Sequence, residues 1–538
     1  MKPTSTNRVP DLMLRRMKRL SRLLPGFLLG VAASAILVSA FILIQRSNIE
    51  LVTLNLFLQV VLIGAFWWWC TLKSGTLLSP PFVFLFAIFF WHSSFLVGRY
   101  FRLDEMFEFS GSVLTYGEEY VPSAVALVSL CMALAVIGSF IGFVQQGGCR
   151  RTARDCSAGP HRLMNGTTGR IGPSLARYAW LLLACYVLLA VAYELVEAKS
   201  TSAGGYLDSY ANVSGSLLYR TYQMTKFLAV PIITLVVAIS RSKASFRIAT
   251  AAILFLMFVS VLSGARTMPF LFLAAMVIAV DQFRWRISLK FVLLIGLLGS
   301  AASWIITESR ATGVGLHVFA FNPAEQPISF WHIWWNSGGS IRAVLRTMEF
   351  TDKMPPLYGR SFLDALVYVV PNPVVTLVAP EWKAQSPGLW MLEQSPDVPI
   401  GEPVGMGYSL IGEAFLNFRL LGCLLFLLIG WLVAYEYFAL LFRGDLFAGL
   451  QSVNLVVLLS LHLRNDSMAY ARVLIWSAVL IWIAGYLRRC RIKLERVSLA
   501  GEKALVGPGD VPERHYSQPA GAPQLQHRIP FSPPRTDR

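Results

Sequence analysis

The chain has 538 residues, of which 55% are hydrophobic and only 14% are charged, and its mean hydropathy is +0.57. Soluble domains carry about 25% charged residues, so this composition excludes a soluble globular protein and indicates an integral membrane protein. The formal net charge of +17 is explained by Lys and Arg in the cytoplasmic segments of a membrane protein. It therefore does not indicate binding to nucleic acid, and we exclude nucleic acid as a partner.

A transmembrane helix needs about 20 apolar residues to cross a hydrocarbon core of about 30 Å. By this measure the sequence predicts an all-α, polytopic membrane protein with about 12 transmembrane helices. The first span is too long for a cleavable signal peptide. In chain order the predicted spans are Pro25–Gln45, Leu51–Leu72, Phe82–Val97, Val121–Val144, Tyr178–Val196, Phe227–Ser240, Ile248–Ser263, Met268–Val280, Phe291–Thr307, Leu420–Leu441, Leu446–Leu463 and Tyr470–Leu487.

Basic residues predict the orientation of the spans. The segment MLRRMKRLSR near the N-terminus and the segment RRCRIKLER after the last span both indicate cytoplasmic termini. The predicted domains are a basic cytoplasmic N-terminus (1–24), nine spans (25–307), a large external loop (308–407), a re-entrant or interfacial segment with three further spans (408–487), and a disordered cytoplasmic tail (488–538). The large loop lies between the ninth and tenth spans, and connections this long are usually functional.

The sequence lacks the residues that characterise several functional classes of protein. The few charged residues within the spans, Glu194, Glu436 and Arg472, lie towards span ends, which disfavours an ion-coupled carrier. The sequence contains no phosphate-binding loop, no dinucleotide-binding glycine pattern and no His/Cys cluster. We therefore predict no metal site and no cofactor. The predicted external loops contain no cysteine, so no disulfide is expected.

One arginine interrupts a long apolar region. In FVSVLSGARTMPFLFLAAM, Arg266 lies between Gly264 and Pro269. The two spans around it together cover residues 248–280, about 50 Å of helix, whereas two full crossings need about 60 Å. The turn should therefore lie below the outer membrane surface, where a cation needs a partner or water. Arg266 either binds an anionic substrate there or snorkels to lipid phosphate.

Other cations are predicted near the same surface. GGSIRAVLRTMEF resembles a helix start with Ser340 as a possible N-cap, and Arg342 and Arg346 are spaced to share one helix face. Such an arrangement suits a phosphate group, although a solvated interfacial helix would have the same pattern. Arg464 and Arg472 flank the outer turn of the last hairpin, with Asp466 between them.

The large loop supplies further candidates for substrate binding. Its FWHIWW segment contains His332, Trp334 and Trp335, and Arg360 follows later in the loop. Aromatic rings can stack on sugar faces, and tryptophans also gather at membrane interfaces without binding a ligand. Arginines near the membrane surface and aromatic residues in the external loop suit a substrate whose anionic group lies at the membrane and whose sugars extend into water. A lipid-diphosphate-linked oligosaccharide has this form.

Three features resemble the Wzy-type O-antigen or oligosaccharide repeat-unit polymerases, which are integral-membrane glycosyltransferases of the GT-C class. They are the SGAR turn between two short spans, the large loop before the last three spans, and GMGYSLIGEAFLNFRLLG, Gly405 to Gly422. The resemblance covers roughly residues 261–476. The chain departs from the family pattern at Arg419, where glycine is expected after Asn417 and Phe418.

The resemblance implies a multi-pass protein of the bacterial inner membrane with a periplasmic active site. It implies transfer of a growing undecaprenyl-diphosphate-linked glycan onto an incoming lipid-linked repeat unit, without a metal. A chain-length regulator and a flippase of the same pathway are possible partners, beside membrane lipid. Arg266 and Glu413 are carried over from the family pattern, and Arg310 and Glu308 are added as catalytic candidates on their chemistry.

The general base stays open among Glu413, Glu308, His317 and His332. Glu413 has a structural alternative, in which its carboxylate pairs with a neighbour and shapes the loop. Two other functions also stay open. A ligase that moves finished glycan to a lipid A core uses similar chemistry, and a flippase for lipid-linked glycan would need polar residues along a path through the bilayer.

Overall fold

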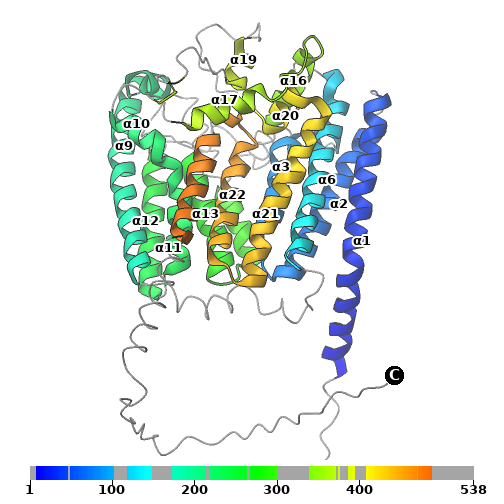
Figure 1. Cartoon of the computed structure of the whole chain (residues 1–538), viewed down its shortest axis with the longest axis horizontal. Coiled ribbons are helices and arrows are strands. Elements are labelled where there is room, and N and C mark those ends of the chain that lie inside the picture. The colour runs from blue at the N-terminus through cyan, green and yellow to red at the C-terminus, as the bar shows by residue number, and fades with distance from the viewer. Residues whose placement is uncertain are drawn as a thin grey trace, which may run out of the picture. The chain divides into compact units, whose positions relative to one another are not determined.

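The structure is a computed structural model. It describes residues 8–45, 49–101, 118–147, 173–213, 217–240, 242–262, 267–299, 339–370, 386–393, 408–468 and 470–486, together with 374, 375 and 378. Every regular element in these ranges is an α-helix or a 3-10 helix (Figure 1). The chain divides into two compact units, Met1–Trp482 and Ile483–Arg538, and the helical bundle belongs to the first. This confirms the all-α class predicted from the sequence.

The α-helices are α1 (Arg8–Gln45), α2 (Ile49–Ser74), α3 (Pro80–His92), α4 (Ser94–Tyr100), α6 (Val121–Gln145), α9 (Pro173–Val213), α10 (Leu217–Thr225), α11 (Ala229–Ile239), α12 (Lys243–Leu262), α13 (Thr267–Phe283), α16 (Ser340–Thr351), α17 (Arg360–Val369), α19 (Pro387–Glu393), α20 (Leu410–Phe418), α21 (Leu424–Arg443) and α22 (Leu446–His462). Three 3-10 helices join them: η1 (Glu118–Tyr120), η3 (Lys226–Leu228) and η5 (Arg419–Cys423).

Six apolar segments in the described ranges are long enough to cross a membrane, and α3 with α4, bent by 56°, would make a seventh. Five shorter apolar helices accompany them, Ala229–Ile239, Met268–Phe283, Leu289–Gly299, Leu446–His462 and Tyr470–Tyr486. Each predicted span overlaps one of these segments. The structure thus confirms a helical protein with several membrane-length helices, and the count of twelve crossings stays a prediction.

Helices α6 and α21 pack with their backbones close together. Gly138 of α6 and Gly430 of α21 face the partner helix, and a Cβ atom at either position would collide with its backbone. The hydroxyl of Ser139 donates to the carbonyl oxygen of Gly430 at 3.2 Å. Small residues allow such close approach, which supplies van der Waals contact where lipid provides no hydrophobic driving force.

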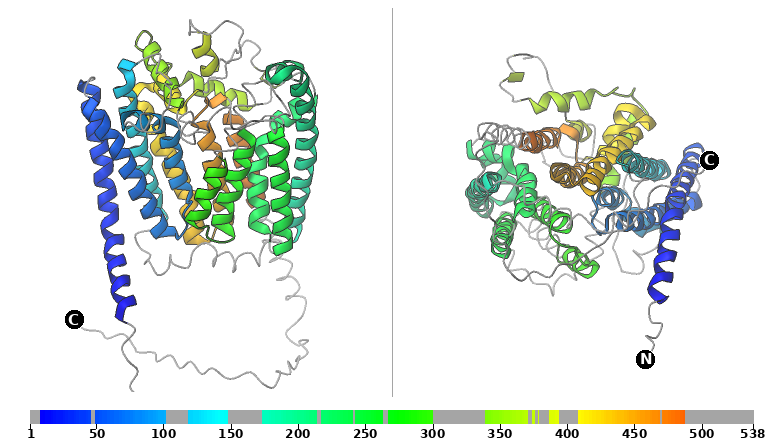
Figure 2. Two further views of the ribbon diagram at one scale, coloured as in Figure 1. Left: turned by 180° about the vertical axis from the view of Figure 1, so that it is seen from behind. Right: turned by 60° about the horizontal axis from the view of Figure 1, so that its bottom comes forward.

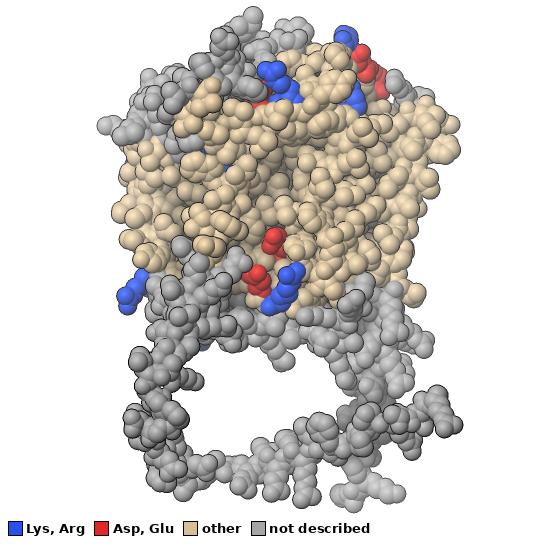
Figure 3. Space-filling view, viewed as in Figure 1, with Lys and Arg blue, Asp and Glu red and all other residues tan. Residues whose placement is uncertain are grey.

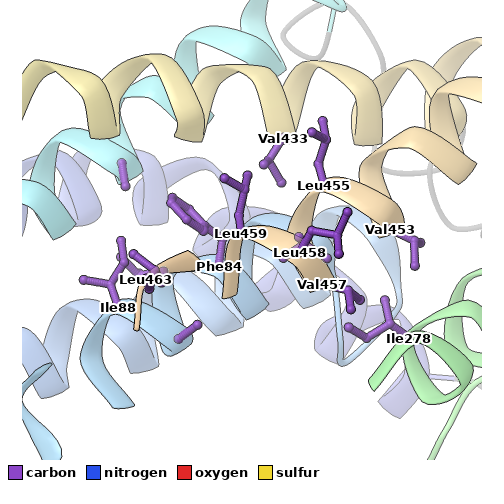
Figure 4. Close-up of a cluster of buried hydrophobic side chains, with 14 of the residues drawn as sticks. Phe84, Ile88, Ile278, Val433, Val453, Leu455, Val457, Leu458, Leu459 and Leu463 are labelled. Carbon is purple, nitrogen blue, oxygen red and sulfur yellow. The ribbon is translucent and has the colours of Figure 1, made fainter. Parts of the chain in front are cut away.

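An apolar core lies between α3, α13, α21 and α22 (Figure 4). Phe84 of α3 lies beside Leu459 of α22, and Ile88 of α3 lies beside Leu463 at the end of α22. All four side chains are buried. This packing positions the C-terminal ends of α3 and α22, and both ends carry residues of the polar site described below.

The short helices α16, α17 and α20 gather at one end of the bundle (Figures 1 and 2). We call this the α20 end. The turn between α21 and α22 lies at the opposite end, where Gly444 adopts a left-handed conformation and Asp445 caps α22. On the face shown in Figure 3, charged side chains of the described residues lie towards the two ends and leave a broad uncharged band. Such a band is what a hydrocarbon core requires.

Candidate functional site

Helix α20 is fixed at its start by hydrogen bonds. The hydroxyl of Ser409 accepts from the backbone N–H groups of Ile411 and Gly412 at 3.1 and 3.3 Å, as an N-cap serine should. The Nδ1 atom of His92 lies 3.0 Å from the carbonyl oxygen of Ile88, so it carries the proton, and Nε2 accepts from Ser409 at 2.8 Å. Helix α3 therefore anchors the first turn of α20.

Glu413 lies one turn into α20 and is completely buried. Its Oε1 accepts a hydrogen bond from the hydroxyl of Ser361 at 2.7 Å, and its Oε2 accepts from the backbone N–H of Ser467 at 2.6 Å. The amide of Asn417 donates to the same Ser361 hydroxyl at 2.7 Å and to the carbonyl oxygen of Glu413 at 2.8 Å. We call Ser361, Glu413, Asn417 and Ser467 the Glu413 cluster.

The Glu413 cluster joins three segments that are distant in the sequence. Ser361 lies in the first turn of α17, Glu413 and Asn417 lie on α20, and Ser467 follows α22. A buried carboxylate is costly unless its oxygens are hydrogen-bonded, and here each oxygen has a partner. The carboxylate therefore ties α17 and the segment after α22 to α20.

A second carboxylate lies next to the cluster along the chain. Asp466 is 8% exposed, and its Oδ2 accepts from the hydroxyl of Ser386 and from the backbone N–H of Gly388, the latter at 3.3 Å. These contacts hold the start of α19 against the turn after α22. The structure shows that Asp466 organises a backbone segment of the predicted large loop.

Two predicted cations lie over aromatic rings near this cluster. The guanidinium of Arg342 on α16 is 5.5 Å from the ring centre of Phe95, and that of Arg464 is 5.2 Å from Trp91. The two rings are only four residues apart, on α4 and α3. Partial desolvation lowers the pKa of Arg342, and an arginine side chain stays charged at neutral pH. The structure thus brings two of the predicted substrate-binding arginines to one aromatic stretch at the α20 end.

The other described arginines have different surroundings. Arg346 is buried and Arg342 is exposed, so the helix face that their spacing predicts is only partly open to solvent. Arg360 forms an ion pair with Asp364 at 3.6 Å and is largely exposed. The Nε of Arg472 donates to the carbonyl oxygen of Tyr368 at 2.8 Å, at the end of α17, with its guanidinium over the tyrosine ring.

The start of α16 corrects one detail of the prediction. The helix begins at Ser340, as expected from the sequence, but its N-cap is Gly339. Ser340 is inside the helix and buried, and its hydroxyl has no hydrogen-bond partner. The hydroxyl therefore does not cap the first turn.

Several predicted site residues lie outside the described part of the chain. They are the catalytic candidates Arg266, Arg310 and Glu308 and the substrate-binding candidates His332, Trp334 and Trp335. The alternative base His317 also lies there. Their roles stay predictions.

Arg419, the departure from the family pattern, occupies a backbone conformation that suits glycine. Its φ is 54° and its ψ is −137°, a region that costs a non-glycine residue of order 1–3 kcal/mol. Its Nη2 donates to the carbonyl oxygen of Thr351 at 2.7 Å and also to that of Met354. These bonds attach the end of α20 to the chain after α16 and offset part of the backbone cost.

Sequence reasoning did not select Ser361, Ser467, Ser409 or His92 as site residues. Serines and histidines have no periodic signal, and these four come from four separate parts of the chain. Ser409 and Asn417 did carry a signal, because both belong to the segment that resembles the family. Among the described residues, no group of three or more His, Cys, Asp or Glu side chains is placed to hold a metal ion.

Apolar helices of membrane length, with a buried polar cluster at one end, define a multi-pass membrane protein. The family model described as O-antigen polysaccharide polymerase Wzy matches residues 29–490, and the chain belongs to this family. The match includes every residue of the Glu413 cluster. No curated protein and no solved structure matches the chain. Family membership makes the chain a glycosyltransferase-type polymerase of O-antigen repeat units, with a lipid-linked oligosaccharide as substrate.

Proposed function

We propose that this polymerase joins undecaprenyl-diphosphate-linked repeat units at the periplasmic face of the inner membrane, with the α20 end outward. The observation that carries the proposal is the Glu413 cluster, which fixes the family segment of α20 beside the cations Arg342 and Arg464. Both the positive-inside pattern and the helical path of α1, whose C-terminal end lies at the α20 end (Figure 1), support this orientation.

The reaction needs stabilisation of a leaving diphosphate. A hydroxyl of the incoming repeat unit attacks the anomeric carbon of the growing glycan, and the bond from that carbon to the diphosphate oxygen breaks. The hydroxyl proton passes to a base, and negative charge accumulates on the diphosphate. Guanidinium groups near the membrane surface stabilise that charge and bind phosphate oxygens in pairs. We assign this role to Arg342 and Arg464 together with Arg266 and Arg310.

Two roles were open for Glu413, and its surroundings support positioning. Both of its oxygens accept hydrogen bonds from the protein, and its side chain is buried. A general base must come within hydrogen-bond reach of the acceptor hydroxyl. We infer that Glu413 holds α20, α17 and the Ser467 turn in place, and that Glu308 is the stronger candidate for the base.

We further propose that the polymerase needs no divalent metal, because arginines supply the positive charge. Polymerisation by purified enzyme in excess EDTA should equal that in Mg²⁺. A rate restored only by the metal would overturn this part of the proposal.

The function is tested by deleting the gene and separating surface glycans on a gel. We expect lipid A cores that carry a single repeat unit, with long chains restored by the intact gene. Loss of every capped core would indicate a ligase, and accumulation of repeat units on the cytoplasmic leaflet would indicate a flippase. Unchanged long chains in the deletion strain would refute all three functions.

A further inference from the structure

A cavity of about 700 Å³ lies beside α20, and none of the residues of the Glu413 cluster lines it. It is lined by the C-terminal end of α1, by α4, by η1 and the first turn of α6, and by the facing parts of α16, α20 and η5. Most of these segments end or begin at the α20 end of the bundle. We call this cavity the Arg419 pocket.

The Arg419 pocket combines charged and apolar walls. Arg99 and Arg419 supply two guanidiniums, and Leu43, Phe415 and Leu420 supply hydrocarbon. The Nη1 of Arg419 is buried and has no hydrogen-bond partner in the protein, although Nη2 has two. A buried charged N–H group requires an acceptor. Arg419 lines the pocket, so an acceptor bound there lies next to its guanidinium.

The segments that carry the apolar wall of the pocket also expose apolar side chains. Leu420, which lines the pocket, is 45% exposed, and its neighbour Leu421 is 72% exposed. On α1, Phe41 and Ile44 beside Leu43 in the sequence are 58% and 79% exposed. Exposed apolar surface of this kind in a membrane protein faces lipid chains. A ligand with a charged head and a hydrocarbon chain therefore matches both parts of the pocket.

Two carboxylates, Glu119 and Asp352, also line the pocket. Asp352 accepts a hydrogen bond of 2.8 Å from the hydroxyl of Tyr120. This bond raises the pKa of Tyr120 to about 12, so the tyrosine stays a donor at neutral pH. The charges of the two guanidiniums and the two carboxylates cancel, so the pocket does not attract small free anions. The hydrocarbon chain must contribute to binding.

We propose that the Arg419 pocket binds the phosphate of a lipid, with the phosphate on Arg99 and Arg419 and the chain leaving past Leu43 and Leu420. The phosphate can belong to a membrane phospholipid or to an isoprenoid diphosphate, because the recognising chemistry is the same. The proposal does not depend on polymerase activity, since binding can be measured without turnover.

The sequence supports a ligand role for Arg419. Glycine would adopt φ 54° and ψ −137° without strain, yet this chain has arginine there. Backbone strain of this kind is retained where the side chain has a task. Its bonds to two carbonyl oxygens use Nη2, and Nη1 has no hydrogen-bond partner in the protein.

The test is lipid binding to the purified full-length protein, measured by native mass spectrometry. The probes are phosphatidylethanolamine, phosphatidylglycerol, undecaprenyl diphosphate and, as a ligand without phosphate, diacylglycerol. The variants are Arg419→Gly, which keeps the backbone conformation, and Arg99→Gln, which changes an exposed side chain. Lys353→Gln is the matched control, because Lys353 is an exposed cation near the same end that does not line the pocket.

We expect each arginine variant to weaken binding of phosphate-bearing lipid by about tenfold or more, the value of one charge-assisted contact. Diacylglycerol binding and the Lys353→Gln protein should be unchanged. Tighter binding of undecaprenyl diphosphate than of phospholipids would assign the pocket to the substrate lipid, and the reverse would assign it to the membrane. The proposal is overturned if both arginine variants retain wild-type affinity, or if diacylglycerol binds as tightly as the phospholipids.

Discussion

Replacing Glu413 by glutamine keeps the size of the side chain but removes its charge and changes its hydrogen bonding. Glu413 now accepts from the Ser361 hydroxyl and the Ser467 N–H. The glutamine amide has one oxygen, and its best use is the Ser467 N–H, which cannot rotate. The Ser361 hydroxyl, which already accepts from Asn417, then loses its acceptor. One unpaired buried donor costs about 1–3 kcal/mol.

Glu413→Ala removes both acceptors and should cost about 2–6 kcal/mol for two unpaired donors, before any cavity cost. We therefore expect the glutamine variant to lower the thermal unfolding temperature and shorten surface glycan chains. The alanine variant should lower protein abundance and abolish long chains. The assays are thermal unfolding of the purified protein and glycan gels, with Ser361→Ala as the matched partner change.

Because Glu413 is proposed to have a positioning role, we expect its substitutions to change stability and activity together. A glutamine variant that unfolds at the wild-type temperature yet makes no polymer would refute it, because the carboxylate would then act on the substrate itself. A glutamine variant with both wild-type stability and normal chain length would show that Glu413 has no role in the site. Coupling between the Glu413 and Ser361 changes of about 0.5–3 kcal/mol in a double-mutant cycle is expected for groups in contact.

Three further predictions concern the cations and the topology. Arg266→Ala should abolish long glycan chains in a protein of normal abundance, since a lost contact to the leaving group costs about 100- to 1000-fold in rate; normal chain length would mean that Arg266 only snorkels. Arg342→Gln with Arg346→Gln should weaken binding of the lipid-linked donor, measured on purified protein, and unchanged affinity would leave α16 as an interfacial helix. A phosphatase fused at Ala384 should be active in the periplasm and one fused at Gly159 inactive, and the opposite pattern would invert the proposed orientation.

Hydropathy and charge were sufficient to locate the helices, because burial in lipid imposes a long apolar segment on each. The start of α16 was also predictable from its glycines. The surroundings of Arg342 and Arg346 were not, since i,i+4 spacing places two side chains on one side of a helix without indicating how deeply each is packed. Only the tertiary structure shows that Arg346 is buried.

The contacts of the Glu413 cluster were even less predictable from the sequence. Ser361 and Ser467 lie 52 and 54 residues from Glu413 in the chain, and nothing in their local sequence distinguishes them from other serines. Arg419 is the opposite case. The family pattern expects glycine there, and the structure shows the reason, because the backbone has the positive φ that glycine adopts most easily.

Helices α16 and α20 are joined at both ends of α20. At the start, the hydroxyl of Tyr408 donates to Thr347 at 3.0 Å. At the end, Arg419 binds the carbonyl oxygens of Thr351 and Met354. Arg342 on α16 and Glu413 on α20 are therefore held in a fixed relation. A lipid phosphate on Arg419 would stabilise the guanidinium that joins the end of α20 to Thr351 and Met354. Occupancy of the Arg419 pocket should therefore rigidify the helix pair that carries the proposed site.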